Sequence, residues 1–198
     1  MIAISIDFVF GKNKKTVYNG ELREWLLEWV ESSRAIITTK PSGLVSGYAY
    51  FLNMLNGSFE KITGGILGLT VHTGNGSPFI LVGEGGNTLN LSIYSLKEKS
   101  LRITGLKTLP EKCTFGKKQK NTAYCLVPFI IPTAIYPDNW YKGDVTFSDS
   151  IWSINLENGE TKLLANLRYP YEAEIDGVNV DIASNDEYMT FINKKDLT

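Results

Sequence analysis

Two cysteines are the residues whose spacing most directly suggests chemistry. Cys113 and Cys125 are the only cysteines of the chain, and the polar segment 116–121 lies between them. If the flanking apolar segments pair as a hairpin with Phe115 roughly facing Thr122, Cys113 lies opposite Cys125. Facing residues on neighbouring strands bring their Cβ atoms to about 4.5–5.5 Å, near the separation that a disulfide requires. The spacing therefore predicts either a disulfide, which fits an oxidising compartment, or two buried thiols that pack as small apolar side chains.

The other side chains suited to catalysis or metal binding form no recognisable motif. His72 is the only histidine, and no nucleophile or carboxylate stands at a catalytic spacing from it. One histidine and two cysteines cannot complete a closed zinc site. Asp138 and Asp149 have the residue types of a glycoside hydrolase pair, but that assignment depends on a separation that sequence does not supply. We therefore predict no catalytic residue, no metal and no cofactor.

The segment 128–149 is the strongest binding candidate. It is long, rich in aromatic residues and proline, and inserted between two predicted hairpins. Loops on a rigid β scaffold often carry binding residues, and aromatic rings beside carboxylates or amides suit sugars, peptides or proteins. Alternatively, the rings pack onto their own sheet and cap its apolar surface. The candidate binding residues are Tyr136, Asp138, Asn139, Trp140, Tyr141 and Asp149.

The elements that must position these residues are two consecutive hairpins. The first joins strands at 111–115 and 122–127. The second joins strands at 151–156 and 160–164 through a turn that contains Asn158-Gly159, a typical hairpin signal. Four strands joined in order in this way predict one antiparallel meander sheet.

The same pair of hairpins recurs along the chain. Ile62, Ile103 and Leu163 occupy equivalent positions, at spacings of about 41 and 60 residues. A four-stranded propeller blade takes about 40–45 residues, and the longer spacing fits a blade that carries the insertion 128–149. Hairpins of the first type are predicted at 28–39, 69–82, 113–127 and 178–192, with a possible further copy at 6–18, and hairpins of the second type at 48–63, 91–104 and 151–164.

This repetition predicts an all-β fold, a β-propeller of four-stranded antiparallel blades with about three full blades and a half blade at each end. A β-sandwich also has many short strands, but successive hairpins lack the long crossings of a Greek key. Only 21–29 has helical periodicity, and we expect strand in its second half because β-branched residues follow at hairpin distance. Residues 1–198 then form a single domain, either a small closed ring or, as we favour, a fragment of a larger propeller.

Composition excludes several classes of partner. The net charge is −1, so no excess of positive charge attracts nucleic acid or anionic membranes to the protein as a whole. With 43% hydrophobic residues, the composition is that of an ordinary globular protein. The longest apolar runs are too short to span a bilayer, and the first residues lack the features of a signal peptide. We expect a cytosolic protein or a piece of a longer chain whose export signal lies elsewhere.

Several short motifs resemble those of uncharacterised bacterial TolB-like, WD-repeat-like β-propeller proteins of candidate-phylum type. They lie at 40–42, 47–53, 109–113, 124–128, 136–143 and 147–152, and the block 109–152 is the most specific. The resemblance implies a propeller over about 24–195 and a binding role without a settled reaction. Relatives of this kind are often tethered by an N-terminal membrane segment, which would place the propeller outside the cytoplasm; this sequence lacks that segment.

Three functional hypotheses follow. The favoured one is a non-enzymatic binding or scaffold module that presents loops, notably 128–149, to a protein, peptide or glycan partner. The alternative is the propeller of a larger hydrolase, like the gating domain of prolyl-oligopeptidase-type enzymes; a Gly-x-Ser-x-Gly segment beyond Thr198 would favour it. The third is a truncated copy with no function of its own, which unpaired strand edges would make poorly soluble.

Overall fold

The computed structural model describes residues 2–5, 15–19, 24–168 and 174–197. Within these residues the chain forms three four-stranded antiparallel sheets and two two-stranded sheets. The first full sheet holds β3 (Trp25–Glu31), β4 (Arg34–Thr39), β5 (Ser46–Asn53) and β6 (Phe59–Leu67). The second holds β7 (Thr70–Thr73), β8 (Phe79–Glu84), β9 (Asn90–Ser95) and β10 (Ser100–Ile103). The third holds β11 (Cys113–Phe115), β12 (Thr122–Pro128), β13 (Asp149–Asn155) and β14 (Thr161–Asn166).

The two-stranded sheets lie at the opposite ends of this array. β1 (Ile2–Ser5) pairs with β2 (Lys15–Asn19), and β15 (Gly177–Ile182) pairs with β16 (Met189–Asn193). The predicted strand at 6–10 lies outside the described residues, and its expected partner at 16–18 falls within β2. The predicted strand in the second half of 21–29 is confirmed as β3, while residues 21–23 lie outside the described part.

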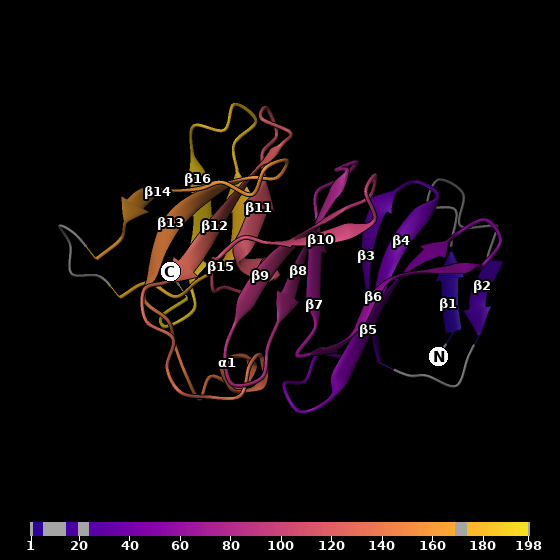
Figure 1. Ribbon diagram of the computed structural model, residues 1–198, viewed down its shortest axis with the longest axis horizontal. Coiled ribbons are helices and arrows are strands. Elements are labelled where there is room, and N and C mark those ends of the chain that lie inside the picture. The colour runs from indigo at the N-terminus through magenta and orange to yellow at the C-terminus, as the bar shows by residue number, and fades with distance from the viewer. Residues whose placement is uncertain (1, 6–14, 20–23, 169–173, 198) are drawn as a thin grey trace.

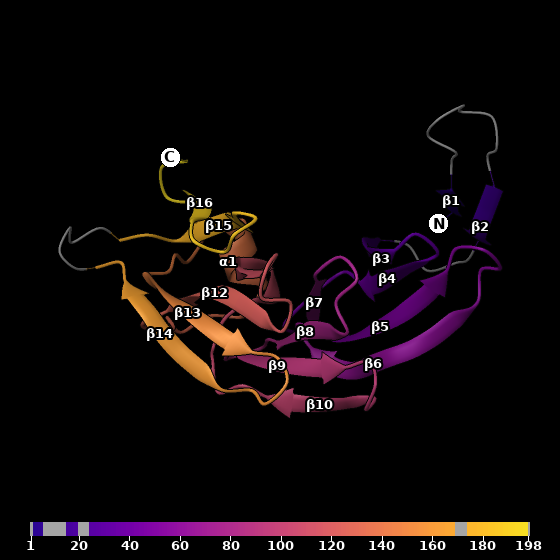
Figure 2. The same cartoon turned by 90° about the horizontal axis from the view of Figure 1, so that it is seen from above.

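The predicted β-propeller is confirmed, and it is a partial one (Figure 1). Within each full sheet the strands are hydrogen-bonded in sequence order, as a meander. Figure 2 shows the sheets following one another along an arc, with β3 and β7 on its concave side and β6, β10 and β14 on its convex side. We call the three full sheets blades 1, 2 and 3.

Both faces of β8 are buried because a neighbouring blade covers each face. Ile80 on β8 packs toward blade 1 with Ile36, whereas the next residue, Leu81, packs toward blade 3 with Cys125. Successive side chains of a strand point to opposite faces, so burial on both sides requires an unbroken apolar run. This explains why 80–82 reads as a continuous hydrophobic stretch rather than an alternating one.

The hairpin turns and the longer loops lie at opposite ends of the strands (Figure 1). One end, the turn face, carries the turns 74–78, 116–121 and 183–188. The other end, the loop face, carries the loops 40–45, 85–89 and 129–148, and Figure 1 shows α1 (Asp138–Lys142) there. A short 3-10 helix, η1 (Pro110–Lys112), leads into β11.

Candidate functional site

The two cysteines pair across the first hairpin of blade 3. Cys113 on β11 faces Cys125 on β12, and their sulfur atoms are bonded at 2.08 Å. Phe115 faces Ala123, one residue from the partner that the sequence suggested. The bridge lies in the core between blades 2 and 3, so it holds the strand that follows η1 against its neighbour.

The excursion 129–148 crosses the loop face and binds blades 1 and 2. Tyr136 and Gly86 form an antiparallel bridge, in which Tyr136 N donates to Gly86 O at 2.7 Å and Gly86 N donates to Tyr136 O at 2.8 Å. Asp138 Oδ2 accepts a hydrogen bond of 2.6 Å from Gly43 N in blade 1. We call residues 129–148 the strap because they connect sheets that are distant in sequence.

Glycines make this close crossing possible. A Cβ atom added at Gly43, Gly68 or Gly85 would lie 2.4, 2.6 or 2.2 Å from the carbonyl oxygen of Tyr136. No side chain tolerates such a separation from backbone. Three loops that contain glycine therefore close around one carbonyl of the strap.

The inside of the strap is an aromatic cluster. Tyr136, Trp140 and Phe147 are buried and stack, with ring centroids 5.8 Å apart for Tyr136 and Phe147 and 5.9 Å apart for Trp140 and Phe147. Tyr136 Oη donates to Pro132 O at 2.6 Å, and burial raises the pKa of this phenol to about 12. Asn139 ties the strap to itself, since its Oδ1 accepts from Ile135 N at 2.8 Å and its Nδ2 donates to Asp144 at 2.9 Å.

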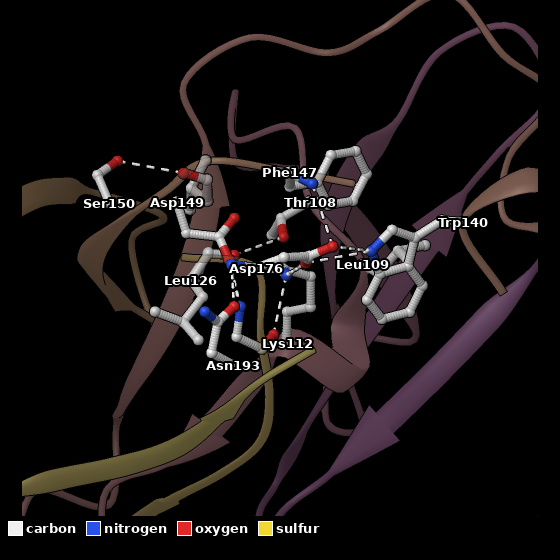
Figure 3. A network of polar contacts seen from close by, with 12 residues as sticks. Thr108, Leu109, Lys112, Leu126, Trp140, Phe147, Asp149, Ser150, Asp176 and Asn193 are labelled. Carbon is white, nitrogen blue, oxygen red and sulfur yellow. Dashed lines mark hydrogen bonds and ion pairs between the residues drawn. The ribbon is translucent and has the colours of Figure 1, made fainter. Parts of the chain in front are cut away.

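Lys112 forms a fully buried ionic network beneath the strap (Figure 3). Its Nζ lies 2.8 Å from Asp149 Oδ2 and 2.6 Å from Asp176 Oδ1, and it donates to Gly177 O at 2.9 Å. All three ionic side chains have no exposed surface. Such a buried network stabilises a fold only when its members are satisfied, so the partners of each carboxylate decide its role.

Asp176 is the better satisfied of the two carboxylates. It accepts hydrogen bonds from Trp140 Nε1 at 2.9 Å and from Phe147 N at 3.1 Å, in addition to Lys112. Asp149 Oδ2 accepts from Gly177 N at 2.8 Å, whereas its buried Oδ1 has no partner among the described residues. Burial raises the pKa of the Asp149 carboxyl, and the Lys112 ammonium opposes this effect. The network joins blade 3, the strap and β15, so it acts as a structural joint, which we call the buried joint.

The structure therefore separates the six predicted binding residues. Tyr136, Trp140 and Asp149 lie in the interior, and Asp138 and Asn139 hold backbone groups of the loop face. Tyr141 is different because 46% of it is exposed. A ligand can reach Tyr141 directly, and binding by the strap stays a prediction that rests mainly on this residue.

Tyr141 borders a cavity on the concave side of the arc. The cavity has a volume of about 380 Å³, and we call it the inner cavity; its lining residues are Leu26, Leu27, Glu28, Thr38, Thr70, Val71, Glu111 and Tyr141. Tyr141 Oη donates to Glu111 Oε1 at 2.5 Å. Burial raises the pKa of Glu111, and burial together with the neighbouring Glu111 carboxylate raises the pKa of Tyr141.

A second polar pair involves Glu28, which also lines the inner cavity. His72 Nδ1 lies 2.8 Å from Glu28 Oε1, and the same oxygen accepts from Thr73 N at 2.9 Å. Sequence reasoning missed Glu28 and Glu111. The signal that could have found them is their position on or just before the first strands of blades 1 and 3, because first strands face the concave side.

Metal binding and membrane spanning have no counterpart in the described residues. No group of three or more His, Cys, Asp or Glu side chains is placed there to hold a metal ion. No helix in residues 24–168 or in the other described segments is long and apolar enough to cross a membrane.

Comparisons with solved structures show which known folds this chain resembles. The structure is similar to TolB from Acinetobacter baumannii, with a TM-score of 0.60 and 12% identity over 98% of this chain and 43% of TolB. It is similar to the tricorn protease, with a TM-score of 0.60 and 10% identity over 92% of this chain and 16% of that protein. A third match is the β-propeller domain of the Trilobed protease from Pyrococcus furiosus, with a TM-score of 0.49 and 10% identity over 100% of this chain and 65% of that one.

These similarities concern the fold. The chain spans less than half the length of TolB and about a sixth of the tricorn protease. Neither models of protein families nor curated protein sequences match it. The TolB-like β-propeller that the sequence motifs suggested is thus confirmed as an architecture.

Proposed function

We propose that this protein is a propeller binding module that holds a protein or peptide partner in the inner cavity, with the strap as one wall. The observation that carries the proposal is the exposed apolar surface of β3. Leu26 and Leu27 line the inner cavity and are 53% and 42% exposed on a strand at the concave side of the arc. Trp29 of the same strand is 53% exposed but is not a lining residue. Clustered exposed apolar side chains next to a cavity are typical of interaction sites.

The polar groups of the cavity indicate what the partner brings. Leu27 and Val71 offer an apolar surface, while Glu28 and Glu111 contribute carboxylates. An apolar side chain of the partner would pack on the leucines, and an amine, guanidinium or amide N–H would meet a carboxylate. Tyr141 suits the edge of such a site because its ring is apolar and its hydroxyl is polar.

Selection from a displayed peptide library tests the proposal. Peptides enriched on the native protein are titrated by fluorescence polarisation against Leu27→Ala, Tyr141→Ala and the control Leu163→Ala. Leu163 is 47% exposed and lies on β14 at the convex side, so it matches Leu27 in residue type and exposure. We expect Leu27→Ala and Tyr141→Ala to weaken binding about tenfold, since central apolar anchors dominate interfaces, and Leu163→Ala to leave it unchanged.

Two results would contradict the proposal. One is the enrichment of no peptide on the native protein, in which case a glycan array tests the remaining partner class. The other is an equal effect of Leu27→Ala and Leu163→Ala on affinity. Thermal melts of every variant separate lost binding from lost folding.

A second candidate is the propeller of a larger hydrolase. It draws on the similarity in fold to the tricorn protease, which supports the architecture and no reaction. The coding sequence that adjoins residue 198 tests this candidate, because a Gly-x-Ser-x-Gly segment in a strand–turn–helix setting would supply the nucleophile. A hydrolase assay on the resulting longer protein would follow.

A further inference from the structure

A second cavity opens between blades 2 and 3 at the turn face. Its volume is about 510 Å³, and it is lined by the turns 74–78 and 116–121 with His72, Thr114 and Val180. It begins on β7 where the inner cavity ends, since Thr70 and Val71 line one cavity and the next two residues line the other. We call it the upper cavity.

The charge of the upper cavity is opposite to that of the inner cavity. Lys117 and Lys120 line it, and no Asp or Glu is among its lining residues. Hydroxyl and amide groups, from Ser77, Thr114 and Asn75, complete a polar wall. Two carboxylates pair with lining residues: the exposed Asp181 lies 2.9 Å from Lys117, and Glu28 lies 2.8 Å from His72.

The turn 116–121 already binds a carboxylate through its backbone. The N–H groups of Lys117, Lys118 and Gln119 donate to the Asp186 carboxylate at 2.8, 3.2 and 2.7 Å. Consecutive N–H groups that converge in this way form an anion-binding concavity. These bonds lower the pKa of Asp186 in spite of its burial. The turn is therefore held in a conformation that favours negative charge, with Lys120 next to it at the cavity wall.

We propose that the upper cavity binds a small phosphate- or carboxylate-bearing molecule, held mainly by Lys120, with Lys117 beside it. Asp186 fills the backbone concavity and fixes the turn. The Lys117 ammonium is already paired with Asp181, so Lys120 is the main cation for the ligand. The hydroxyl and amide groups of the wall serve polar substituents of the ligand. This site is independent of the partner site at the inner cavity.

The test is a titration of the intact protein with inorganic phosphate and with citrate, followed by calorimetry and by amide chemical shifts, at constant ionic strength set with sodium chloride. We expect saturable binding of at least one probe, with shifts centred on 74–78 and 116–121. Lys120→Ala should weaken binding about tenfold, as the loss of one charge-assisted contact does. Added salt should weaken binding of the native protein in the same direction.

Lys142→Ala is the matched control because it removes an exposed lysine at the loop face. It should bind the probe like the native protein, and Leu27→Ala should do the same, which separates this site from the partner site. The proposal is wrong if neither probe binds, or if Lys142→Ala weakens binding as much as Lys120→Ala. Lys120→Gln provides a second variant of similar length should the alanine variant lose stability.

Discussion

Glu111 and Lys112 are neighbours in η1, yet they belong to two charged regions of opposite character. Lys112 has no exposed surface and meets two carboxylates and a carbonyl in the buried joint. Glu111 is half-buried, meets the hydroxyl of Tyr141 and borders the inner cavity. A buried charge with several protein partners holds the fold together, whereas a charged side chain with one partner beside a cavity can still bind a ligand.

The strap supplies a residue to each region. Trp140 turns inward to Asp176, and Tyr141, the next residue, meets Glu111 at the cavity. Lys194 adds to the inward side, since its Nζ donates to Trp140 O and lies 4.3 Å from the centre of the Trp140 ring. The position of the strap therefore sets both the stability of the joint and the shape of the candidate site.

Replacing Lys112 by methionine breaks the buried joint and has the largest expected effect. The change leaves Asp149 and Asp176 buried without their shared cation, which costs about 3–5 kcal/mol of the free energy of unfolding. Urea unfolding followed by fluorescence measures it. Lys142→Met is the control, because substitution of an exposed lysine changes stability by about 0.5 kcal/mol or less.

The triple variant Lys112→Met/Asp149→Asn/Asp176→Asn sharpens this test. It removes all three charges together, so no ion is left uncompensated, and part of the lost stability should return. If Lys112→Met unfolds at the same urea concentration as Lys142→Met, the joint does not stabilise the fold.

Removal of the disulfide loosens β11, the strand that directly follows Glu111 and Lys112 of η1. Cys113 follows Lys112 directly, and its bridge closes a loop with a sequence separation of 12 residues. In the chain-entropy description such a loop contributes about 3 kcal/mol, so Cys113→Ala/Cys125→Ala should lose about that much stability. Intact mass after alkylation without reductant checks the bridge itself, and labelling of both thiols in the native protein would refute it.

Gly85→Ala displaces the strap from blade 2. The added Cβ would stand 2.2 Å from the Tyr136 carbonyl oxygen, so the crossing must open, at a cost of about 1–3 kcal/mol. Both regions should respond, with lower stability and weaker peptide binding at the inner cavity. Gly65→Ala is the control, since nothing lies within 4 Å of a Cβ there although its φ of +79° adds backbone strain. Native stability and native peptide affinity of Gly85→Ala would mean that Gly85 is not required for the crossing.

Glu111→Gln has the smallest expected effect on the free energy of unfolding. Its effect depends on pH, which distinguishes the contribution of Glu111 at the inner cavity from that of the buried joint. Burial raises the pKa of Glu111 above its ordinary value of 4.5, so the folded protein keeps this proton at a pH where the unfolded chain has lost it. The stability that this proton contributes is fully present below pH 4.5, and it is lost as the pH rises through the pKa of Glu111 in the folded protein. The native protein should therefore gain stability relative to Glu111→Gln on acidification from neutral pH to 4.5.

The pH series has an internal control. Burial also raises the pKa of Asp149, but Asp149 titrates in both proteins, so its contribution cancels in the difference. Parallel stability profiles for the two proteins would show that Glu111 is solvated like an ordinary carboxylate.

Local patterns predicted the blades well. The turn at Asn158-Gly159 and the alternation of apolar residues around it specify a hairpin through contacts between residues close in sequence. The facing of Cys113 and Cys125 followed from the same reasoning, although the register near the turn differed by one residue at Phe115.

The fate of individual polar residues could not be predicted in this way. Trp140 and Asp149 have the residue types of a binding loop, and both lie in the interior. Trp140 meets Asp176, which lies 36 residues later and just before β15, and Asp149 shares Lys112 with the same Asp176. Glu28 meets His72 from another blade. Spacing along the sequence does not predict these contacts, because they depend on how whole sheets pack against one another.

The repeated antiparallel hairpins follow from the amino-acid sequence alone, because turn residues and side-chain alternation act over a few residues. That Glu111 faces a cavity while Lys112 is enclosed, and that the strap joins distant sheets, depends on the packing of the whole chain. The packing of neighbouring blades determines which side chains of each segment are buried. A charged side chain that is buried in this way needs ionic or hydrogen-bonding partners, and these come from other parts of the chain.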